Sequence, residues 1–145
     1  MKLVICDDDV TLRSVVSRLA EGLGHIVIAE TDSAADAVEL VTRFGAEGLV
    51  LDLSLPWGTG MAALHDLRAR GSACQVIVFT SYLEAFDDAR ESGARAVIEK
   101  PDFEALESVL GELAGRPGLA DPDAPAVERR RPPRERPKVR PPAQR

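Results

Sequence analysis

The sequence lacks the features expected of a secreted, membrane-spanning or thiolate-metal protein. It holds only two cysteines in 145 residues, and Cys6 and Cys74 are too few and too far apart for a zinc site. No apolar run approaches the roughly 18 residues that a membrane-spanning helix needs, and the N-terminus has no secretory pattern. We therefore expect a cytoplasmic protein with free thiols and no membrane insertion.

Aromatic residues are also scarce, at 4%, and charge is divided unevenly along the chain. Residues 1–114 carry 9 Lys/Arg and 20 Asp/Glu, a net of −11, whereas residues 115–145 carry 9 and 4, a net of +5, with 8 of the 10 prolines. The second part has little to bury, so we predict a folded domain over 1–114 and a disordered Pro/Arg-rich basic tail over 115–145. This tail is a tether, a linker to a missing output domain, or a binding segment.

Specific nucleic-acid recognition is not expected from either part, although the basic tail could attract a protein partner, RNA, DNA or an anionic surface. The acidic body repels nucleic acid, and residues 129–140 of the tail hold seven basic side chains without an aromatic ring to stack on bases. Any nucleic-acid binding by the tail would be nonspecific and sensitive to salt.

The first 114 residues alternate between short apolar runs and stretches with helical spacing. The runs are nearly continuous in their apolar character, which is typical of strands that are covered on both faces. We predict five strands, at Leu3–Cys6, Ile26–Ala29, Leu49–Leu53, Val76–Phe79 and Ala96–Ile98. Strands that alternate with helices indicate a doubly wound α/β fold with a parallel sheet.

Capping residues and apolar stripes mark the helices between the predicted strands. Asp9 and Asp102 are expected to cap the first and the fifth helix. Leu83, Phe86 and Ala89 form the stripe of the fourth helix.

Acidic and other polar side chains follow the predicted strands. Asp7 and Asp8 follow the first strand, Asp52 ends the third, Thr80 follows the fourth and Lys100 follows the fifth. In a parallel sheet these positions lie at one edge. If the first and third strands are neighbours, the three acids meet in one cleft.

Three carboxylates in one cleft repel one another unless a cation neutralises them. A cluster of oxygen ligands without His or Cys suits Mg²⁺. A carboxylate can also act as a nucleophile and form an aspartyl phosphate, and a nearby hydroxyl and ammonium, such as Thr80 and Lys100, can stabilise the incoming charge. The set of residues therefore indicates phosphoryl transfer.

Four segments carry a resemblance to a known family: LVICDD, LVLDLSLPWGTG, VIVFTS and IEKP. Over about residues 1–114 the sequence resembles the CheY-like receiver domains of bacterial two-component response regulators. The resemblance implies a flavodoxin-like three-layer sandwich, with a five-stranded sheet of order 2-1-3-4-5 flanked by five helices.

The resemblance also implies a function and a set of roles. Asp52 would be the phosphoacceptor, with Thr80 and Lys100 as switch and catalytic residues, and Mg²⁺ would be bound by Asp7, Asp8, Asp52 and the backbone carbonyl of Ser54. The phosphoryl donor would be a sensor histidine kinase or a phosphotransfer protein. The chain would then be a single-domain response regulator, not a separate enzyme, which catalyses only its own phosphorylation and dephosphorylation. It would act on a downstream protein target, with a phosphorylation-dependent homodimer as a further partner state.

Some positions depart from the family pattern. Val97 stands where Tyr or Phe is usual, so the aromatic movement coupled to Thr80 cannot occur in that form. Ser54 and Tyr82 occupy positions that tune the lifetime of the phosphoryl group in the family. The two histidines, His25 and His65, are expected to be ordinary surface or boundary residues.

Three other functions compete with the receiver interpretation. A phosphatase of the haloacid-dehalogenase type would use Asp7 as nucleophile and Asp9 as acid/base, but it would leave Asp52 without a role. A flavin-binding module would need a loop that accepts the phosphate group of the flavin, and the three consecutive aspartates would repel that phosphate. A receiver-like interaction module that never uses phosphate is the third alternative, and Val97 keeps it open.

Overall fold

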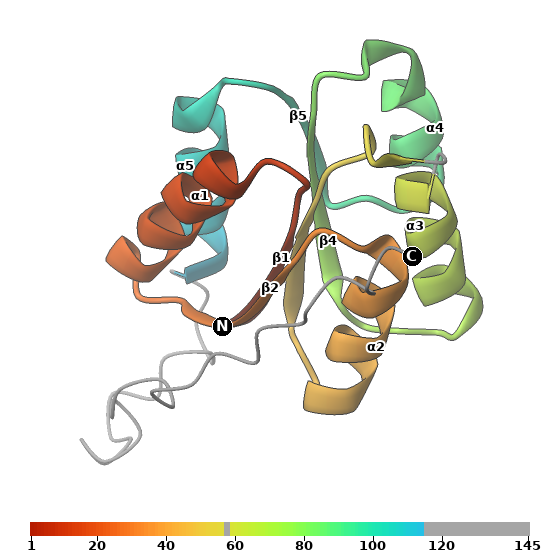
Figure 1. Cartoon of the computed structure of the whole chain (residues 1–145), viewed down its shortest axis with the longest axis horizontal. Helices are drawn as coiled ribbons and strands as arrows, with labels where there is room; N and C mark the ends of the chain where they lie inside the picture. The colour runs from red at the N-terminus through yellow and green to blue at the C-terminus, as the bar shows by residue number, and fades with distance from the viewer. Residues whose placement is uncertain (57–58, 115–145) are drawn as a thin grey trace, which may run out of the picture.

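The computed structural model describes residues 1–56 and 59–114, which form a parallel five-stranded sheet between two layers of helices (Figure 1). The strands are β1 Lys2–Cys6, β2 Ile26–Thr31, β3 Gly48–Leu51, β4 Gln75–Thr80 and β5 Ala96–Glu99. The helices are α1 Val10–Gly22, α2 Ala34–Phe44, α3 Thr59–Ala69, the 3-10 helix η2 Leu83–Ala85, α4 Phe86–Glu91 and α5 Phe103–Ala114. The order β2-β1-β3-β4-β5 confirms the predicted topology.

Two hydrophobic cores lie on the two faces of the sheet, because the strands carry apolar side chains on both faces. Helices α1 and α5 cover one face, and α2, α3 and α4 cover the other (Figure 1). The core under α1 and α5 consists of Leu3, Ile5, Val16, Ala20, Val27, Val50, Ile77, Phe79, Ile98, Leu106, Leu110 and Leu113. Both faces are thus closed by packed side chains.

The sheet ladders continue past the strand ends and hold the following residues in place. Strand β1 pairs with β3 up to Cys6 and Leu51, and the Asp52 amide then donates to the Cys6 carbonyl at 3.0 Å. On the other side of β1, the Asp7 amide donates to the Thr31 carbonyl at 3.0 Å. Asp7 and Asp52 are therefore fixed by backbone hydrogen bonds at the carboxyl edge of the sheet.

The predicted caps are confirmed. The Asp9 carboxylate accepts from the Leu12 amide at 3.0 Å, and the Asp102 carboxylate accepts from the Ala105 amide at 2.9 Å. Both acids satisfy amide groups that the first turn of a helix leaves free.

The bounds of the strands and two other details of the sequence prediction were wrong. Strands β1, β2, β4 and β5 are each one or two residues longer than predicted, because the ladder pairs continue to Thr31 and Thr80, so Thr80 is the last residue of β4 and does not follow it. The third strand ends at Leu51 and not at Leu53, because the chain turns at Asp52. The expected fourth helix is shorter, since its first turn is 3-10 and only Phe86–Glu91 is α-helical. His25 is buried, at 4% exposure, because its ring packs under α5 and donates to the Leu110 carbonyl at 2.7 Å.

Other expectations are confirmed or remain outside the described part of the chain. Cys6 and Cys74 are free and buried, and His65 is exposed. Within residues 1–56 and 59–114, no helix is long and apolar enough to span a bilayer. The prediction for the tail over 115–145 falls on residues that the structure does not describe.

Candidate functional site

Four strands end in the same kind of turn, in which a side chain at the strand end accepts a hydrogen bond from the amide two residues later. The pairs are Asp7 and Asp9 at 2.9 Å, Thr31 and Ser33 at 3.1 Å, Asp52 and Ser54 at 2.9 Å, and Thr80 and Tyr82 at 3.2 Å. A short polar side chain is required for this turn. The same contact fixes the orientation of each side chain at the sheet edge.

The three acids predicted to meet do so. One carboxylate oxygen from each of Asp7, Asp8 and Asp52 lies within 4.8 Å of the other two. Asp7 and Asp52 are 5% and 2% exposed, whereas Asp8 is open to solvent. The donor set consists of hard oxygen atoms with one solvent-facing side, which fits Mg²⁺ because this ion prefers carboxylate oxygens and retains several waters.

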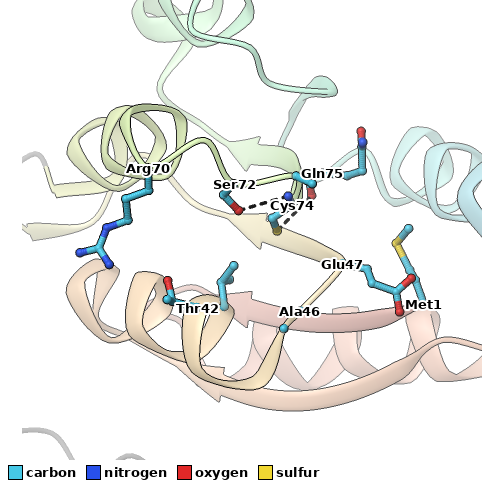
Figure 2. A pocket seen from close by; sticks show the side chains of 11 residues that line it. Met1, Thr42, Ala46, Glu47, Arg70, Ser72, Cys74 and Gln75 are labelled. Carbon is cyan, nitrogen blue, oxygen red and sulfur yellow. Dashed lines mark hydrogen bonds between the residues drawn. The ribbon is translucent and has the colours of Figure 1, made fainter.

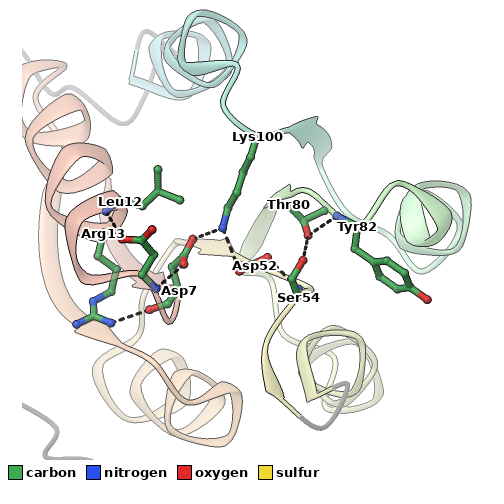
Figure 3. A network of polar contacts seen from close by, with 9 residues as sticks. Asp7, Leu12, Arg13, Asp52, Ser54, Thr80, Tyr82 and Lys100 are labelled. Atoms are coloured by element: carbon green, nitrogen blue, oxygen red, sulfur yellow. Dashed lines mark hydrogen bonds and ion pairs between the residues drawn. The ribbon is translucent and has the colours of Figure 1, made fainter.

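Lys100 reaches across the edge from the end of β5 and bridges two of the acids (Figure 3). Its Nζ lies 2.6 Å from Asp7 Oδ2 and 3.0 Å from Asp52 Oδ2. Burial acts to lower the pKa of Lys100, but its hydrogen bonds to Asp7 and Asp52 outweigh burial, and the pKa lies above its usual value. Lys100 is therefore a permanent positive charge in the site.

The charge of Asp7 is less stable than its ion pair suggests. Burial raises the pKa of Asp7, and the opposing hydrogen bonds from Lys100 and the Asp9 amide do not fully cancel this effect. Desolvation of a carboxylate disfavours its ionised form. A bound cation would therefore relieve an existing electrostatic cost at Asp7.

Thr80 and Ser54 lie beside Asp52 and are in contact with each other. Their hydroxyl oxygens are 3.0 Å apart, and Thr80 is fully buried. The Tyr82 amide donates to Thr80 Oγ1, while Tyr82 as a residue is 47% exposed and its ring points away from Asp52 (Figure 3). Val97 is half-buried and packs against the core on the α2, α3 and α4 side.

The structure therefore brings together the residues that the sequence singled out at the strand ends, and with them Ser54, which the resemblance added. These are Asp7, Asp8, Asp52, Ser54, Thr80 and Lys100. Their chemical roles remain predictions.

Two neighbours of the site were not predicted. Arg13 donates from Nη1 to the Asp7 carbonyl at 2.6 Å, and its place one turn into α1 carries no signal that separates it from other surface arginines. Gly60, the second residue of α3, lies against the chain at Asp52, where an added Cβ would be 2.6 Å from the Asp52 carbonyl oxygen. A glycine a few residues after a strand-end acid is a signal for such close approach.

A pocket of about 560 Å³ lies at the opposite edge of the sheet and carries none of this chemistry (Figure 2). It is lined by the loops that precede β3 and β4, including Ala46, Glu47, Ser72 and Cys74. Burial raises the pKa of the Cys74 thiol to about 11, so the thiol stays protonated and is a poor nucleophile. The candidate site is therefore the carboxyl edge of the sheet, where Asp7, Asp8 and Asp52 meet, here called the acidic edge.

Comparison with known proteins agrees with this geometry. The family model described as the response regulator receiver domain matches residues 3–110. The two-component response regulator PhoP of Pseudomonas aeruginosa is 32% identical over 120 residues, which are 80% of this chain and 52% of the relative. The chain therefore spans about half the length of that relative. The chemotaxis protein CheY of Listeria monocytogenes is 26% identical over 103 residues, which are 70% of this chain and 87% of the relative.

Solved structures with similar folds include two other regulators. A DNA-binding response regulator of the LuxR family from Staphylococcus aureus has a TM-score of 0.71 and 25% identity, covering 78% of this chain and 98% of that chain. The REC domain of AraT, a response regulator from Geobacillus stearothermophilus, has a TM-score of 0.68 and 26% identity, covering 78% and 92%. The family model matches most of the chain, and the sheet order and the three clustered acids agree with it. The chain therefore belongs to the family of response regulator receiver domains.

Proposed function

We propose that the chain accepts a phosphoryl group on Asp52 in phosphorelay signal transduction. Mg²⁺ would be held by Asp7, Asp8, Asp52 and the backbone carbonyl of Ser54. One observation carries the proposal: the carboxylate oxygens of three acids lie within 4.8 Å of one another, with the Lys100 ammonium 3.0 Å from Asp52. A nucleophile, a cation site and a fixed positive charge are therefore adjacent.

In the proposed step, a carboxylate oxygen of Asp52 forms a bond to phosphorus, and the bond from phosphorus to the donor atom breaks with its electrons leaving on the donor. When bound, the metal ion neutralises negative charge between the phosphoryl group and the acids. Lys100, already 3.0 Å from Asp52, supplies positive charge to a phosphoryl oxygen. The Thr80 hydroxyl donates a hydrogen bond to a second phosphoryl oxygen. This contact couples phosphorylation to β4 and the segment that follows it.

The family of the chain is a signalling family, whose members interact with histidine kinases and downstream effectors. We infer that the donor here is a sensor histidine kinase or a phosphotransfer protein, and that the phosphorylated domain binds a protein target or a second copy of itself. The proposed location is the cytoplasm, which suits two free buried thiols. The proposed activity is limited to the domain's own phosphorylation and dephosphorylation.

The test is labelling with acetyl phosphate and Mg²⁺, followed by peptide mapping of the modified residue. We expect one phosphoryl group on Asp52 in the wild-type chain and none in Asp52→Asn. Asp9→Asn is the matched control. Like Asp52→Asn it removes one carboxylate charge, here two residues from Asp7, and asparagine can still cap α1. This control should be labelled on Asp52.

Each other outcome has a distinct meaning. Phosphate on Asp7 would support the phosphatase alternative and overturn the proposal, as would persistent labelling of Asp52→Asn. A wild-type chain that takes no label and binds no beryllofluoride would instead be the interaction module that does not use phosphate.

A further inference from the structure

Beside the phosphoacceptor, two hydroxyl groups form a hydrogen bond to which the proposed function assigns no role. Ser54 Oγ and Thr80 Oγ1 are 3.0 Å apart, and the contact joins the loop after β3 to the end of β4 (Figure 3). The two side chains differ in their access to water, because Thr80 is 0% exposed and Ser54 is exposed. This difference identifies the donor.

Thr80 Oγ1 already accepts from the Tyr82 amide at 3.2 Å, and an amide can only donate. In the part of the chain that the structure describes, Ser54 Oγ is the only acceptor to which the Thr80 hydroxyl is hydrogen-bonded. If Ser54 were the donor, the Thr80 proton would be buried without a partner, which is costly. Ser54 can direct its own proton to solvent. Thr80 is therefore the donor and Ser54 the acceptor.

We infer that Ser54 is a positioning residue whose hydroxyl holds the Thr80 proton in the resting domain. This inference rests on the proposed function, in which Thr80 must give the same proton to a phosphoryl oxygen on Asp52. A hydroxyl has one proton to donate, so Thr80 must leave Ser54 before it can bind the phosphoryl group. The Ser54 side chain thus stabilises the resting state against the phosphorylated one.

Removal of the Ser54 hydroxyl should shift this balance toward the phosphorylated state. In Ser54→Ala the buried Thr80 proton has no acceptor in the resting state, whereas its contact with a phosphoryl group is unaffected. A ligand that binds the phosphorylated-like state gains affinity when the resting state is destabilised. Ser54→Thr retains a hydroxyl at the same position and should shift the balance less than Ser54→Ala does.

The experiment is calorimetric titration of the full chain with beryllofluoride, a phosphoryl analogue, at saturating Mg²⁺. Four variants accompany the wild type: Ser54→Ala, Ser54→Thr, Thr80→Ala and the double variant Ser54→Ala/Thr80→Ala. We expect Ser54→Ala to bind roughly fivefold more tightly than the wild type, which is about 1 kcal/mol at ~1.4 kcal/mol per tenfold. In the Thr80→Ala background the Ser54→Ala change should have no effect, because the proton that Ser54 holds is absent.

Several outcomes would overturn the inference. They are unchanged or weaker binding by Ser54→Ala, equally tight binding by Ser54→Thr and Ser54→Ala, or the same gain in the Thr80→Ala background. The proposed function survives all three, since the wild type still binds the analogue. If the wild type shows no Mg²⁺-dependent binding, the proposed function fails and the role of Ser54 fails with it.

Discussion

Among the acids at the carboxyl edge, Asp8 differs from the other two in its surroundings. Asp7 and Asp52 are buried and paired with Lys100, whereas Asp8 is exposed and forms no ion pair or hydrogen bond within residues 1–56 and 59–114. A cation can therefore bind Asp8 without displacing Lys100. Of the three carboxylates in the proposed Mg²⁺ site, Asp8 is thus the one that no described cation already neutralises.

We predict that Asp8→Asn weakens Mg²⁺ binding roughly tenfold or more, since affinity at oxygen sites follows the number of charged ligands. The wild-type dissociation constant should lie between about tens of micromolar and about a millimolar, as expected for a site with few protein ligands. Calorimetric titration with MgCl₂ measures both. Asp32→Asn is the control, because Asp32 is another exposed acid that follows a strand but lies outside the cluster. Equal affinities of Asp8→Asn and the wild type would contradict the metal assignment.

The residues of the site were predictable to the extent that residue type and strand position determine them. A strand-end carboxylate or hydroxyl is visible in the sequence, and parallel strands gather their ends at one edge, so Asp52 and Thr80 could be placed. The Ser54–Thr80 hydrogen bond was not predictable, because it depends on side-chain rotamers and on the exact path of the loop after β3. The burial of His25 was missed because a single histidine before a strand has no distinctive pattern.

At the level of whole elements, the start of α3 lies against the loop that holds Asp52. A Cβ at Gly60 would lie 2.6 Å from the Asp52 carbonyl oxygen and 2.7 Å from Leu53 Cα, both backbone atoms. Neither contact can be relieved by a side-chain rotation. The helix therefore needs glycine at this position to approach Asp52.

We predict that Gly60→Ala displaces the backbone at Asp52, lowers the free energy of unfolding by about 1–3 kcal/mol as an overpacked site, and slows labelling by acetyl phosphate. Gly111→Ala is the matched control, because a Cβ at Gly111 in α5 meets nothing within 4 Å. That variant should gain up to about 1 kcal/mol from helix propensity. Urea unfolding and labelling rates test both, and a Gly60→Ala chain as stable as the wild type would refute the close approach.

His25 links the start of β2 to α5 and makes this contact sensitive to pH. Its Nε2 lies 2.7 Å from the Leu110 carbonyl, and its Nδ1 lies 3.1 Å from the amino group of Met1, a positive charge. Burial lowers the pKa of His25 from its ordinary value of 6.5, and the hydrogen bond to Leu110 only partly opposes this. The folded state thus prefers the neutral ring.

A lowered folded-state pKa gives stability that is present above about pH 6.5 and is lost as the pH falls, because the unfolded chain then binds a proton that the folded chain does not. We predict that the wild type loses more unfolding free energy between about pH 7.5 and about pH 5.5 than His25→Gln does. Urea unfolding at the two pH values measures the difference. His65→Gln changes the exposed histidine and should keep the wild-type loss; an equal loss in all three chains would contradict the role of His25.

For the molecule as a whole, the predicted boundary at residue 114 can be tested by truncation. Residues 1–114 contain both hydrophobic cores, so this fragment should fold and take label on Asp52. A fragment ending at residue 102 lacks α5 and with it Leu106, Leu110 and Leu113, each 0% exposed. Burial of each leucine contributes roughly 1.5–3 kcal/mol, and the three together approach the total stability of a typical domain, about 5–15 kcal/mol.

The shorter fragment should therefore be unfolded and unlabelled, as circular dichroism and mass spectrometry would show. Failure of the fragment 1–114 to fold would mean that residues beyond 114 belong to the domain.

The architecture was more predictable than the boundaries of its elements. Continuous apolar runs separated by amphipathic stretches leave few arrangements other than a doubly wound sheet, and the resemblance to receivers supplied the strand order. The end of β3 and the short α4 were missed because local turns decide them. Asp52 accepts from the Ser54 amide, and the 3-10 turn from Leu83 to Ala85 replaces a helical turn without changing the apolar spacing.

The direction of α5 places its two ends at opposite edges of the sheet. The helix starts three residues after Lys100, at the acidic edge, and its 12 residues run back along the sheet toward the edge where the pocket lies. At 1.5 Å per residue the chain leaves the helix roughly 18 Å from where it entered. A reporter group coupled to a side chain at Ala114 would therefore lie at the edge opposite Asp52, away from the proposed phosphorylation site.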